Sequence, residues 1–504
     1  MIIAERQTSP GRRLLKLAVA LPCALLLGAR ETSVAPRRSA AASRVALKPC
    51  QLPNVDGEAR CGSYDVYENR DARAGRKISL NIVVLPALEA SQAPDPVFWL
   101  HGGPGAAATQ TVGAAKGGFL EVFRKDRDLV FVDQRGTGKS NGLACDVGDD
   151  PAKLQSYFGK LFPTDAIRAC RERLEESADL RFYTTPIAMD DLDEVRAALG
   201  YKKINIVAAS YGTIAAQAYM RQHPGSVRAV FLVGVATPGV KQPLLFAPAA
   251  QHALDLLFVD CAADELCNRA FPNLKSEFDA LLARFDQGPL EVSMREPATK
   301  KTQTVRLERE NFVERIRLLL YTTTFASFVP LVVHKAYQGD FVPFEAISIA
   351  YNPGSILSRG MYFTVSCSEG VPFISEPEIV NESQGTFLGE TRVRAHVEAC
   401  RLWPRANVSR HFIDPVKSAL PVLMFSGELD GSTPPWFAKR AVEYLPNARQ
   451  ITARYYGHQL DSQCLWAVMR DFIQNASARG IDTSCSEKIR RPPFATDIPQ
   501  PFAL

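Results

Sequence analysis

The protein has 504 residues, of which 46% are hydrophobic and 22% are charged, and its formal net charge is +5 at pH 7. The first 48 residues hold nine Lys or Arg and two Asp or Glu, which leaves 50 basic and 52 acidic residues in the rest of the chain. No cluster of Lys and Arg in that rest favours a nucleic-acid partner. The roughly 456 residues after position 48 exceed what one compact core usually holds, so we expect one large domain with an insertion, or two domains.

The first 48 residues have the pattern of a secretory leader and a linker. Arg12, Arg13 and Lys16 precede an apolar run at 17–28 that is short for a membrane span, and small residues follow it. We therefore expect an exported protein, secreted or periplasmic, without stable membrane insertion once the leader is removed. A retained anchor is the alternative, and three cleavage positions stay open: after Ala29, Ala35 or Ala42.

The cysteine content agrees with export. Of eleven cysteines, Cys23 lies in the predicted leader and ten remain, an even set that allows up to five disulfides. Pairing of neighbours along the chain is the simplest arrangement, although the sequence leaves the connectivity open. The rival interpretation is a metal site, but the chain has no C-x-x-C and its histidines are scattered. We expect neither metal nor organic cofactor.

Buried strands that stop at glycine-rich loops form the first half of the predicted core. Residues 77–85 are an expected entry strand, 96–100 run into His101-Gly-Gly-Pro-Gly105, and 129–133 run into a second glycine-rich loop at 134–140. With helical patterns between them, such strands predict a doubly wound, mostly parallel sheet with its site at the carboxyl ends of the strands. Neither loop has the spacing of a phosphate-binding P-loop.

Residues 186–199 predict a helix that ends at Gly200. Its apolar positions form a buried stripe. Its acidic run, which includes Asp191, is interpreted as a solvated helix face rather than a metal site.

The central stretch is Ile204 to Thr213. A β-branched strand, 204–209, runs directly into Ser210, and a helix of small residues follows and ends near His223-Pro224. Strand, sharp turn, serine and helix is the context of a nucleophile elbow, in which the hydroxyl is exposed at the tip of a tight bend. Ala208 stands where the G-x-S-x-G pattern has its first glycine, and alanine is the smallest departure from it.

After a strand at 227–233 the strand–loop rhythm stops. Residues 236–416 show helical patterns and predict a mainly helical cap, inserted between two strands of the core, which covers the site and selects substrates. The predicted organisation is therefore a leader at 1–48, the first part of the core at 49–235, the cap at 236–416, and the second part of the core with a C-terminal tail at 417–504.

The sheet resumes at 421–427, and Asp430 follows the end of this strand. His458 comes 28 residues later, after another strand-like segment. The order Ser210, Asp430, His458 is that of the α/β-hydrolase fold, in which the acid orients the imidazole and the imidazole takes the serine proton. Glu428 is the competing acid, but it stands less suitably, just inside the strand end.

An oxyanion hole is expected from the N–H of Tyr211 and from Gly103, whose glycine loop brings backbone N–H groups close to a substrate carbonyl. His101 in the same loop is interpreted as ordering the loop by a hydrogen bond rather than as a catalytic base.

Taken together, these motifs resemble the secreted α/β-hydrolase aminopeptidases, the family of proline iminopeptidase and the tripeptidyl aminopeptidases. The resemblance covers about 60–235 and 415–475, and H-G-G-P-G with D-Q-R-G-x-G is its most specific part. It is carried by His101-Gly-Gly-Pro-Gly105, Asp133-Gln-Arg-Gly-Thr-Gly138, Asp191-Leu-Asp-Glu-Val-Arg-Ala-Ala-Leu-Gly200, Ser210-Tyr-Gly-Thr213, Gly427-Glu-Leu-Asp430 and Gly457-His458.

The resemblance implies a serine exopeptidase without a cofactor that releases residues or short peptides from substrates with a free N-terminus. Relatives bind the substrate's ammonium through acidic residues of the cap, and Glu369, in Cys367-Ser-Glu369, resembles a segment with that role. Gly370 departs from the pattern, because similar proteins often place Asp there. An esterase on the same scaffold and a non-enzymatic binding protein are the alternatives, and the oligomeric state is left open.

Overall fold

The structure is a computed structural model that describes residues 45–498 except 56, 90, 91, 149, 151, 297 and 298. The chain divides into two units, 1–41 and 42–504, and the described residues belong to the second. The predicted leader therefore lies outside the described residues, apart from its last four positions. Within the described residues, no helix combines the length and the apolar character of a membrane span.

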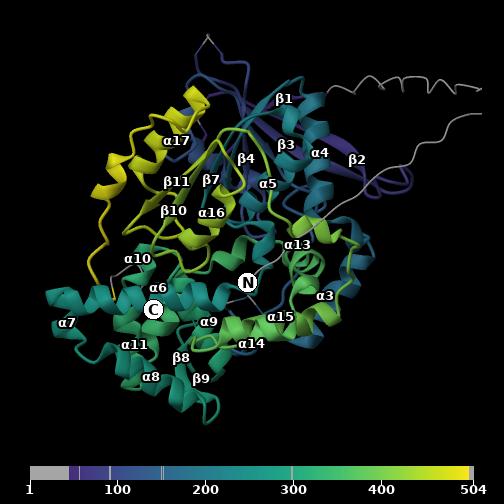
Figure 1. Cartoon of the computed structure of the whole chain (residues 1–504). Helices are drawn as coiled ribbons and strands as arrows, with labels where there is room; N and C mark the ends of the chain where they lie inside the picture. Colours follow the sequence, from purple (N-terminus) through teal and green to yellow (C-terminus); the bar gives the residue numbers. More distant parts are fainter. Residues whose placement is uncertain are drawn as a thin grey trace, which may run out of the picture. The chain divides into compact units, whose positions relative to one another are not determined.

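A nine-stranded sheet forms the core (Figure 1), and its strand order is β1-β2-β3-β5-β4-β6-β7-β10-β11. β1, β2 and β3 pair antiparallel, β3 is antiparallel to β5, and all later pairings are parallel. The predicted doubly wound, mostly parallel sheet is confirmed. Its strands are β1 Lys48–Cys50, β2 Ala59–Tyr67, β3 Lys77–Leu85, β4 Val97–Leu100, β5 Leu129–Val132, β6 Ile204–Ala209, β7 Val227–Val233, β10 Val422–Gly427 and β11 Ala448–Ala453.

Helices cover both faces of this sheet, which explains why β4 and β5 are apolar throughout. In β4, Phe98 and Leu100 join one buried cluster while Val97 and Trp99 join another, as the alternation of side chains across a sheet requires. The first cluster contains residues of α4 (Thr185–Ala198), α5 (Tyr211–Gln222) and α16 (Pro435–Val442). The second contains residues of α1 (Glu121–Arg124) and α17 (Gln463–Asn475).

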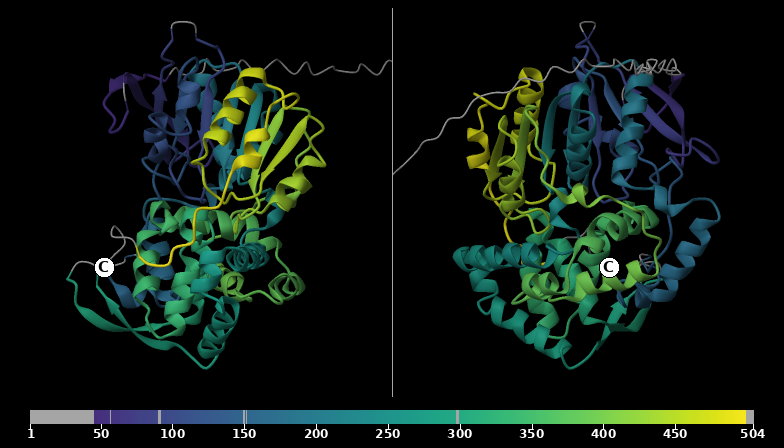
Figure 2. Two further views of the ribbon diagram at one scale, coloured as in Figure 1. Left: turned by 90° about the vertical axis from the view of Figure 1, so that its left-hand side faces the viewer. Right: turned by 45° about the vertical axis from the view of Figure 1, so that its right-hand side comes forward.

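The stretch between β7 and β10 forms a mainly helical cap at the carboxyl ends of the parallel strands (Figures 1 and 2), and the predicted range 236–416 falls within it. It also contains a two-stranded hairpin, β8 (Leu290–Arg295) and β9 (Thr302–Leu307), that the sequence analysis missed. Its helices are α6 Phe246–Ala263, α7 Glu265–Ala270, α8 Leu274–Phe285, α9 Arg309–Leu319, α10 Thr323–Ala326, α11 Val329–Tyr337, α12 Val342–Ala350, α13 Arg359–Val365, α14 Glu376–Ser383 and α15 Thr391–Arg401.

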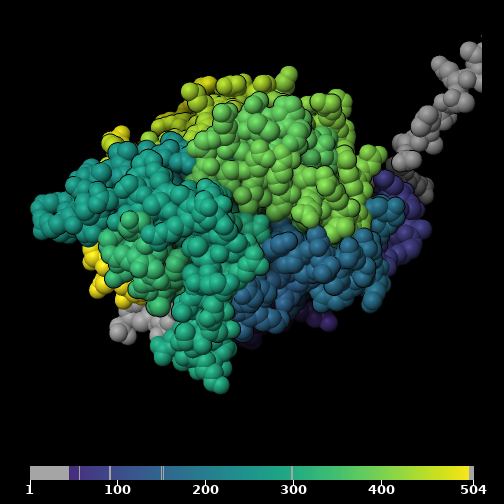
Figure 3. Space-filling model, turned by 90° about the horizontal axis from the view of Figure 1, so that it is seen from below, coloured from purple at the N-terminus to yellow at the C-terminus, as the bar shows by residue number. Residues whose placement is uncertain are grey.

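Two other segments pack against the cap. The segment after β5 carries α2 (Leu154–Tyr157) and α3 (Thr164–Glu175), and Tyr157 and Phe158 are buried in the main cluster of the cap. Figure 3 shows this segment, in blue, beside the green and teal cap. The C-terminal segment runs from α17 down onto the cap (Figure 2), where Arg491 forms an ion pair of 2.8 Å with Asp260.

Five disulfides join neighbouring cysteines along the chain. The pairs are Cys50–Cys61, Cys145–Cys170, Cys261–Cys267, Cys367–Cys400 and Cys464–Cys485. The structure therefore has the sequential pairing that the sequence predicts as the simplest arrangement.

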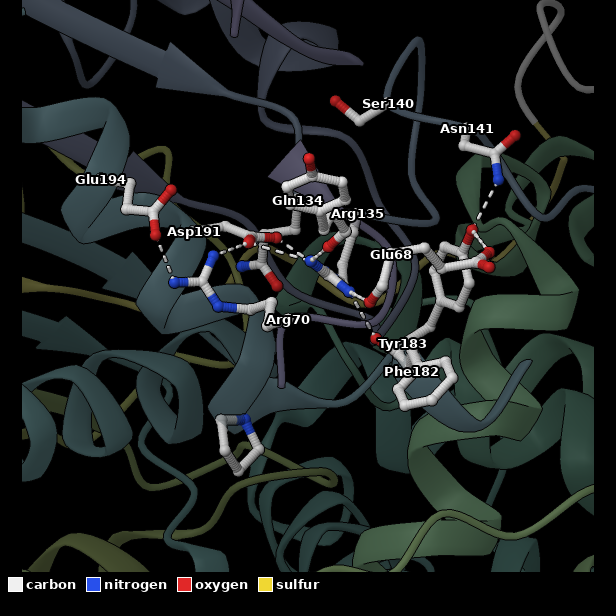
Figure 4. A network of polar contacts seen from close by, with 12 residues as sticks. Glu68, Arg70, Gln134, Arg135, Ser140, Asn141, Phe182, Tyr183, Asp191 and Glu194 are labelled. Carbon is white, nitrogen blue, oxygen red and sulfur yellow. Dashed lines mark hydrogen bonds and ion pairs between the residues drawn. The ribbon is translucent and has the colours of Figure 1, made fainter. Parts of the chain in front are cut away.

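A buried arginine joins two of the sequence motifs. Arg135, from the loop after β5, donates to both carboxylate oxygens of Asp191 on α4, at 2.6 and 2.9 Å, and its other donors bond backbone oxygens of Tyr67, Glu68 and Phe182. Five hydrogen bonds therefore engage all five N–H groups of this guanidinium (Figure 4). The network holds the loop after β5 against α4.

This network corrects the interpretation of the acidic run on α4. Asp191 was expected on a solvated face, but it is 2% exposed and also accepts a bond of 2.7 Å from Arg70. Arg70 in turn pairs with Glu194 at 2.6 Å (Figure 4). The helical periodicity of α4 could not predict the burial of Asp191, because its partners Arg135 and Arg70 lie more than 50 residues away in the chain.

Substituting Arg135 is expected to destabilise the protein strongly. Arg135→Met removes a fully buried cation and leaves Asp191 and three backbone oxygens short of donors, which should lower the free energy of unfolding by about 3–5 kcal/mol. The matched control is Arg181→Met, since Arg181 is 63% exposed and pairs with Asp179 at the surface, where a much smaller loss is expected. Urea unfolding of both variants measures the difference, and equal losses would contradict the structural role of Arg135.

Candidate active site

Ser210 lies at a sharp bend between β6 and α5, with φ 57° and ψ −129°. This backbone conformation is rarely adopted by a residue with a side chain and is characteristic of functional sites. The Ser210 N–H donates to the carbonyl oxygen of Val233 at 3.0 Å, which fastens the bend to the neighbouring strand. The structure thus gives Ser210 the backbone geometry of a nucleophile elbow.

The bend needs small residues around it. A Cβ on Gly212 would lie 2.3 Å from the carbonyl oxygen of Leu100, and a Cβ on Gly102 would lie 2.8 Å from the Cβ of Ser210. Neither position has room for a side chain. Ala208, in contrast, fits fully buried at the end of β6, so the departure from the usual glycine is accommodated without loss of the elbow.

Asp430 and His458 form a hydrogen-bonded pair at the ends of β10 and β11. His458 Nδ1 lies 2.7 Å from Asp430 Oδ2, and Asp430 is fully buried. The other carboxylate oxygen accepts the backbone N–H groups of Ser432 and Thr433, both at 2.8 Å. With Asp430 as acceptor, the proton of a neutral His458 is on Nδ1 and Nε2 is left as a base.

Thr433 completes this pair, and sequence reasoning missed it. Its hydroxyl donates to Asp430 Oδ2 at 2.7 Å and lies 2.9 Å from His458 Nδ1. Burial alone would raise the pKa of Asp430, but the interaction with His458 and the hydrogen bonds from Thr433 bring that pKa below its ordinary value. These interactions favour the ionised form of the carboxylate. The sequence feature that could have identified Thr433 is its position three residues after an aspartate at the end of a strand.

The cap holds the loop that carries His458. The carbonyl oxygen of Tyr321 accepts the His458 N–H at 2.5 Å, and the two rings meet edge to face with centroids 5.3 Å apart. The next residue, Gln459, exchanges two hydrogen bonds with Thr323, at 3.0 and 2.8 Å. Since these contacts come from the loop after α9 and from the first residue of α10, the position of the imidazole depends on the cap.

A cavity of about 290 Å³ lies between core and cap, and both Ser210 and His458 line it. This volume is at the lower end of the range for small-molecule sites. The described hydrogen bonds include none between Ser210 and His458, so the structure brings the two residues to one cavity without joining them directly. Catalytic hydrogen bonds are often long before substrate binds.

The predicted oxyanion residues are also beside Ser210. Gly103 lines the cavity with φ 115°, a conformation open to glycine, and Tyr211 is the first residue of α5. His101 Nδ1 accepts the N–H of Gly102 at 2.6 Å, which is the loop-ordering bond expected of this histidine. Burial lowers the pKa of His101 to about 4, so the ring stays neutral.

Glu369 is buried in the cap, and its contact with a substrate ammonium stays a prediction. It is 5% exposed, on a π-helical turn at Ser366–Gly370, and it is not among the described residues that line the cavity. Its oxygens accept the N–H and the hydroxyl of Thr185, at 2.5 and 2.6 Å, and the Thr185 hydroxyl lies 2.5 Å from that of Tyr211. Glu369 is thus joined through Thr185 to the side chain of Tyr211, the residue after Ser210.

Among the described residues, no group of three or more His, Cys, Asp and Glu side chains is arranged to hold a metal ion. The expectation that the protein works without a metal or cofactor remains a prediction.

Sheet topology, nucleophile elbow and cap together define an α/β hydrolase. Comparison with known families agrees, since residues 95–341 match the model described as alpha/beta hydrolase fold and residues 385–485 match the model described as TAP-like protein. The chain therefore has the α/β-hydrolase fold, and its C-terminal part matches the TAP-like model.

Its curated relatives include peptidases. The serine protease Hip1 of Mycobacterium tuberculosis is 26% identical over 271 residues, 49% of this chain and 50% of the relative. The tripeptidyl aminopeptidase of Streptomyces coelicolor is 28% identical over 230 residues, 42% and 41% of the two chains. The proline iminopeptidase of Neisseria gonorrhoeae is 31% identical over 150 residues, 29% and 35%. The chain thus matches half or less of the length of these relatives.

The raised pKa of Glu369 predicts a pH-dependent stability. Burial raises this pKa from 4.5 to about 7, although the bonds from Thr185 oppose the shift. A raised carboxyl pKa stabilises the fold fully below pH 4.5, and the stabilisation, about 3 kcal/mol, is lost as pH rises from 4.5 through 7. Glu369→Gln stays neutral and is expected to lose less stability over this window than the parent protein.

Thermal unfolding of both proteins between pH 4.5 and 8 measures the effect. Burial also raises the pKa of Glu345 to about 7, but that group adds the same slope to both proteins, so only their difference is informative. Parallel profiles would show that Glu369 does not titrate in this window.

Proposed function

We propose that this α/β hydrolase is an exported serine peptidase that cleaves peptide bonds near a free N-terminus through an acyl-enzyme. One observation carries the proposal: Ser210, on a strained elbow, shares a cavity with His458, which is hydrogen-bonded to the buried Asp430. Its similarity to peptidases supports the substrate class, and five disulfides support an oxidising compartment outside the cytoplasm.

In the proposed reaction His458 Nε2 takes the proton of the Ser210 hydroxyl as Oγ attacks the substrate carbonyl carbon. The N–H groups of Tyr211 and Gly103 receive the developing oxyanion. His458 then passes the proton to the leaving amine, and Asp430 stabilises the charged imidazole in between. Water hydrolyses the acyl-enzyme by the same sequence of proton transfers, which restores Ser210.

The cavity and the relatives together support exopeptidase action. A volume of about 290 Å³ beneath a cap accommodates a short substrate segment rather than a folded chain, and two of the relatives are named as an aminopeptidase and an iminopeptidase. One observation favours the second candidate, a carboxylesterase. Glu314 is the one carboxylate among the described residues lining the cavity, and it is bonded to Arg317 and Arg392. A dedicated acidic partner for an ammonium group is thus not evident there.

Three chromogenic substrates separate these functions: a tripeptide anilide with a free amino group, the same compound N-acylated, and a short-chain ester. We expect cleavage of the free-amine anilide alone, and a loss of about 10³-fold or more in kcat for Ser210→Ala, because the nucleophile is removed. Initial rates with the leaderless protein measure this. Ser276→Ala, an exposed serine on α8, is the matched control and should retain full activity.

Cleavage of the ester with both anilides untouched would replace the peptidase with the esterase. Turnover that survives Ser210→Ala would contradict the assignment of the nucleophile for either function.

A further inference from the structure

One wall of the cavity is strongly cationic. The positively charged residues that line it are Lys160, Arg315, Arg317, Arg359 and Arg392, against Glu314 as the one carboxylate among the described lining residues. Arg315 and Arg317 lie on α9 with Glu314, and Arg392 reaches in from α15. We call Arg315, Arg317 and Arg392 the arginine wall.

Glu314 does not neutralise this wall. Its Oε1 accepts Nη2 of Arg317 at 2.6 Å and Nη1 of Arg392 at 2.9 Å, and its Oε2 accepts Nε of Arg317 at 2.8 Å. One negative charge is thus shared between two buried guanidiniums, with a third, Arg315, close enough to lower the pKa of Glu314. Burial would raise that pKa, but the arginines bring it to about 2. Glu314 therefore stays ionised beside the charged arginines.

The surrounding polar groups add no negative charge. Tyr362 accepts a bond of 2.7 Å from Arg392 Nη2, and its hydroxyl lies 2.8 Å from His396 Nε2. Burial, together with the charge of Arg392, keeps the pKa of His396 well below its ordinary value, so this histidine is neutral. The guanidinium of Arg317 lies 4.8 Å from the centroid of the Phe246 ring. An aromatic face attracts a cation but does not cancel its charge.

The hydrogen-bonding capacity of the wall is also incompletely used. Bonds to described residues occupy three of the five N–H groups of Arg317 and two of those of Arg392. Arg392 Nε is buried without a partner. Arg135, whose role is structural, has all five occupied. Because buried donors without partners are costly, the open N–H groups of Arg317 and Arg392 favour an acceptor at the wall.

The wall lies one aromatic ring away from the proposed catalytic histidine. Arg317 Nη1 donates to the hydroxyl of Tyr321 at 2.7 Å, and the Tyr321 ring is 5.3 Å from the ring of His458. A group bound at the wall would therefore lie in the same cavity as Ser210 and His458.

We propose that the arginine wall binds a carboxylate of the substrate, so that the enzyme selects compounds that carry a negative charge close to the scissile bond. The carboxylate comes either from the C-terminus of a short peptide or from an acidic side chain. Planar carboxylates match the fork of a guanidinium, and such charged bonds are stronger when both groups are shielded from water. The consequence for turnover rests on the proposed function, but the binding itself does not.

Binding is measured without catalysis on full-length Ser210→Ala protein by calorimetry. Trialanine is compared with trialanine amide for the terminal carboxylate, and Ala-Glu-Ala amide with Ala-Gln-Ala amide for an acidic side chain. We expect at least one carboxylate peptide to bind about tenfold or more tightly than its uncharged partner. The pair that shows the difference identifies the source of the carboxylate. Equal affinities within both pairs, or no binding of any of the four peptides, overturn the proposal.

Arg392→Gln in the same background tests the wall itself. This change leaves Glu314 bonded to Arg317, and it should abolish the preference for the carboxylate, whereas Arg392→Lys should retain part of it. Arg394→Gln is the matched control, since Arg394 lies on the same helix but is 43% exposed and pairs with Glu376 and Glu390. Thermal unfolding verifies that each variant is folded. A preference unchanged in a folded Arg392→Gln protein overturns the assignment to the wall.

The outcome is independent of whether the proposed function holds. If Ser210-dependent turnover is absent but the carboxylate preference is found and depends on Arg392, the peptidase proposal fails and the binding proposal stands. If turnover is found without any carboxylate preference, the binding proposal fails and the peptidase proposal stands.

Discussion

The close crossing of α5 over the sheet at Ser210 is the constraint on which the rest of the structure depends. The helix passes so near β4 that Gly212 has no room for a Cβ beside the carbonyl oxygen of Leu100, and Gly102 has none beside Ser210. This approach forces the strained backbone of Ser210 and places its side chain at the carboxyl end of the sheet. Strain of this kind persists only where neighbouring structure holds it in place.

Much of that support comes from the cap. Glu369 of the cap binds Thr185, whose hydroxyl contacts that of Tyr211 directly after the proposed nucleophile. On the opposite side of the site, Tyr321 and Thr323 hold the backbone of His458 and the side chain of Gln459. The cap therefore supports the residues beside Ser210 and the loop of His458, in addition to enclosing the substrate. A change in the cap far from the cavity can be transmitted to both.

The charge of the cavity distinguishes this chain from the pattern that its resemblance implied. An acidic cap residue was expected to receive a substrate ammonium, yet Glu369 is buried and bonded to Thr185 and Glu314 is shared between two arginines. The proposed catalytic residues and the charges of the cavity come from different parts of the chain. The elbow and the Asp430–His458 pair lie on strands and loops of the core, whereas Glu314, Arg315, Arg317 and Arg392 lie on the helices α9 and α15 of the cap.

Features encoded over a few neighbouring residues could be predicted from the sequence alone. The buried strands, the elbow around Ser210, the order of Asp430 and His458 and the hydrogen bond of His101 all follow from local patterns, because strand, turn and loop geometry depend on adjacent residues. The β8–β9 hairpin was missed, although the alternation of apolar and polar residues in Leu290–Arg295 could have predicted β8 from the sequence. Tertiary structure alone decided the partners of Asp191, the burial of Glu369 and the grouping of Arg317 with Arg392. Each of these depends on which face of a helix meets a segment distant in the chain, and a local pattern carries no information on that contact.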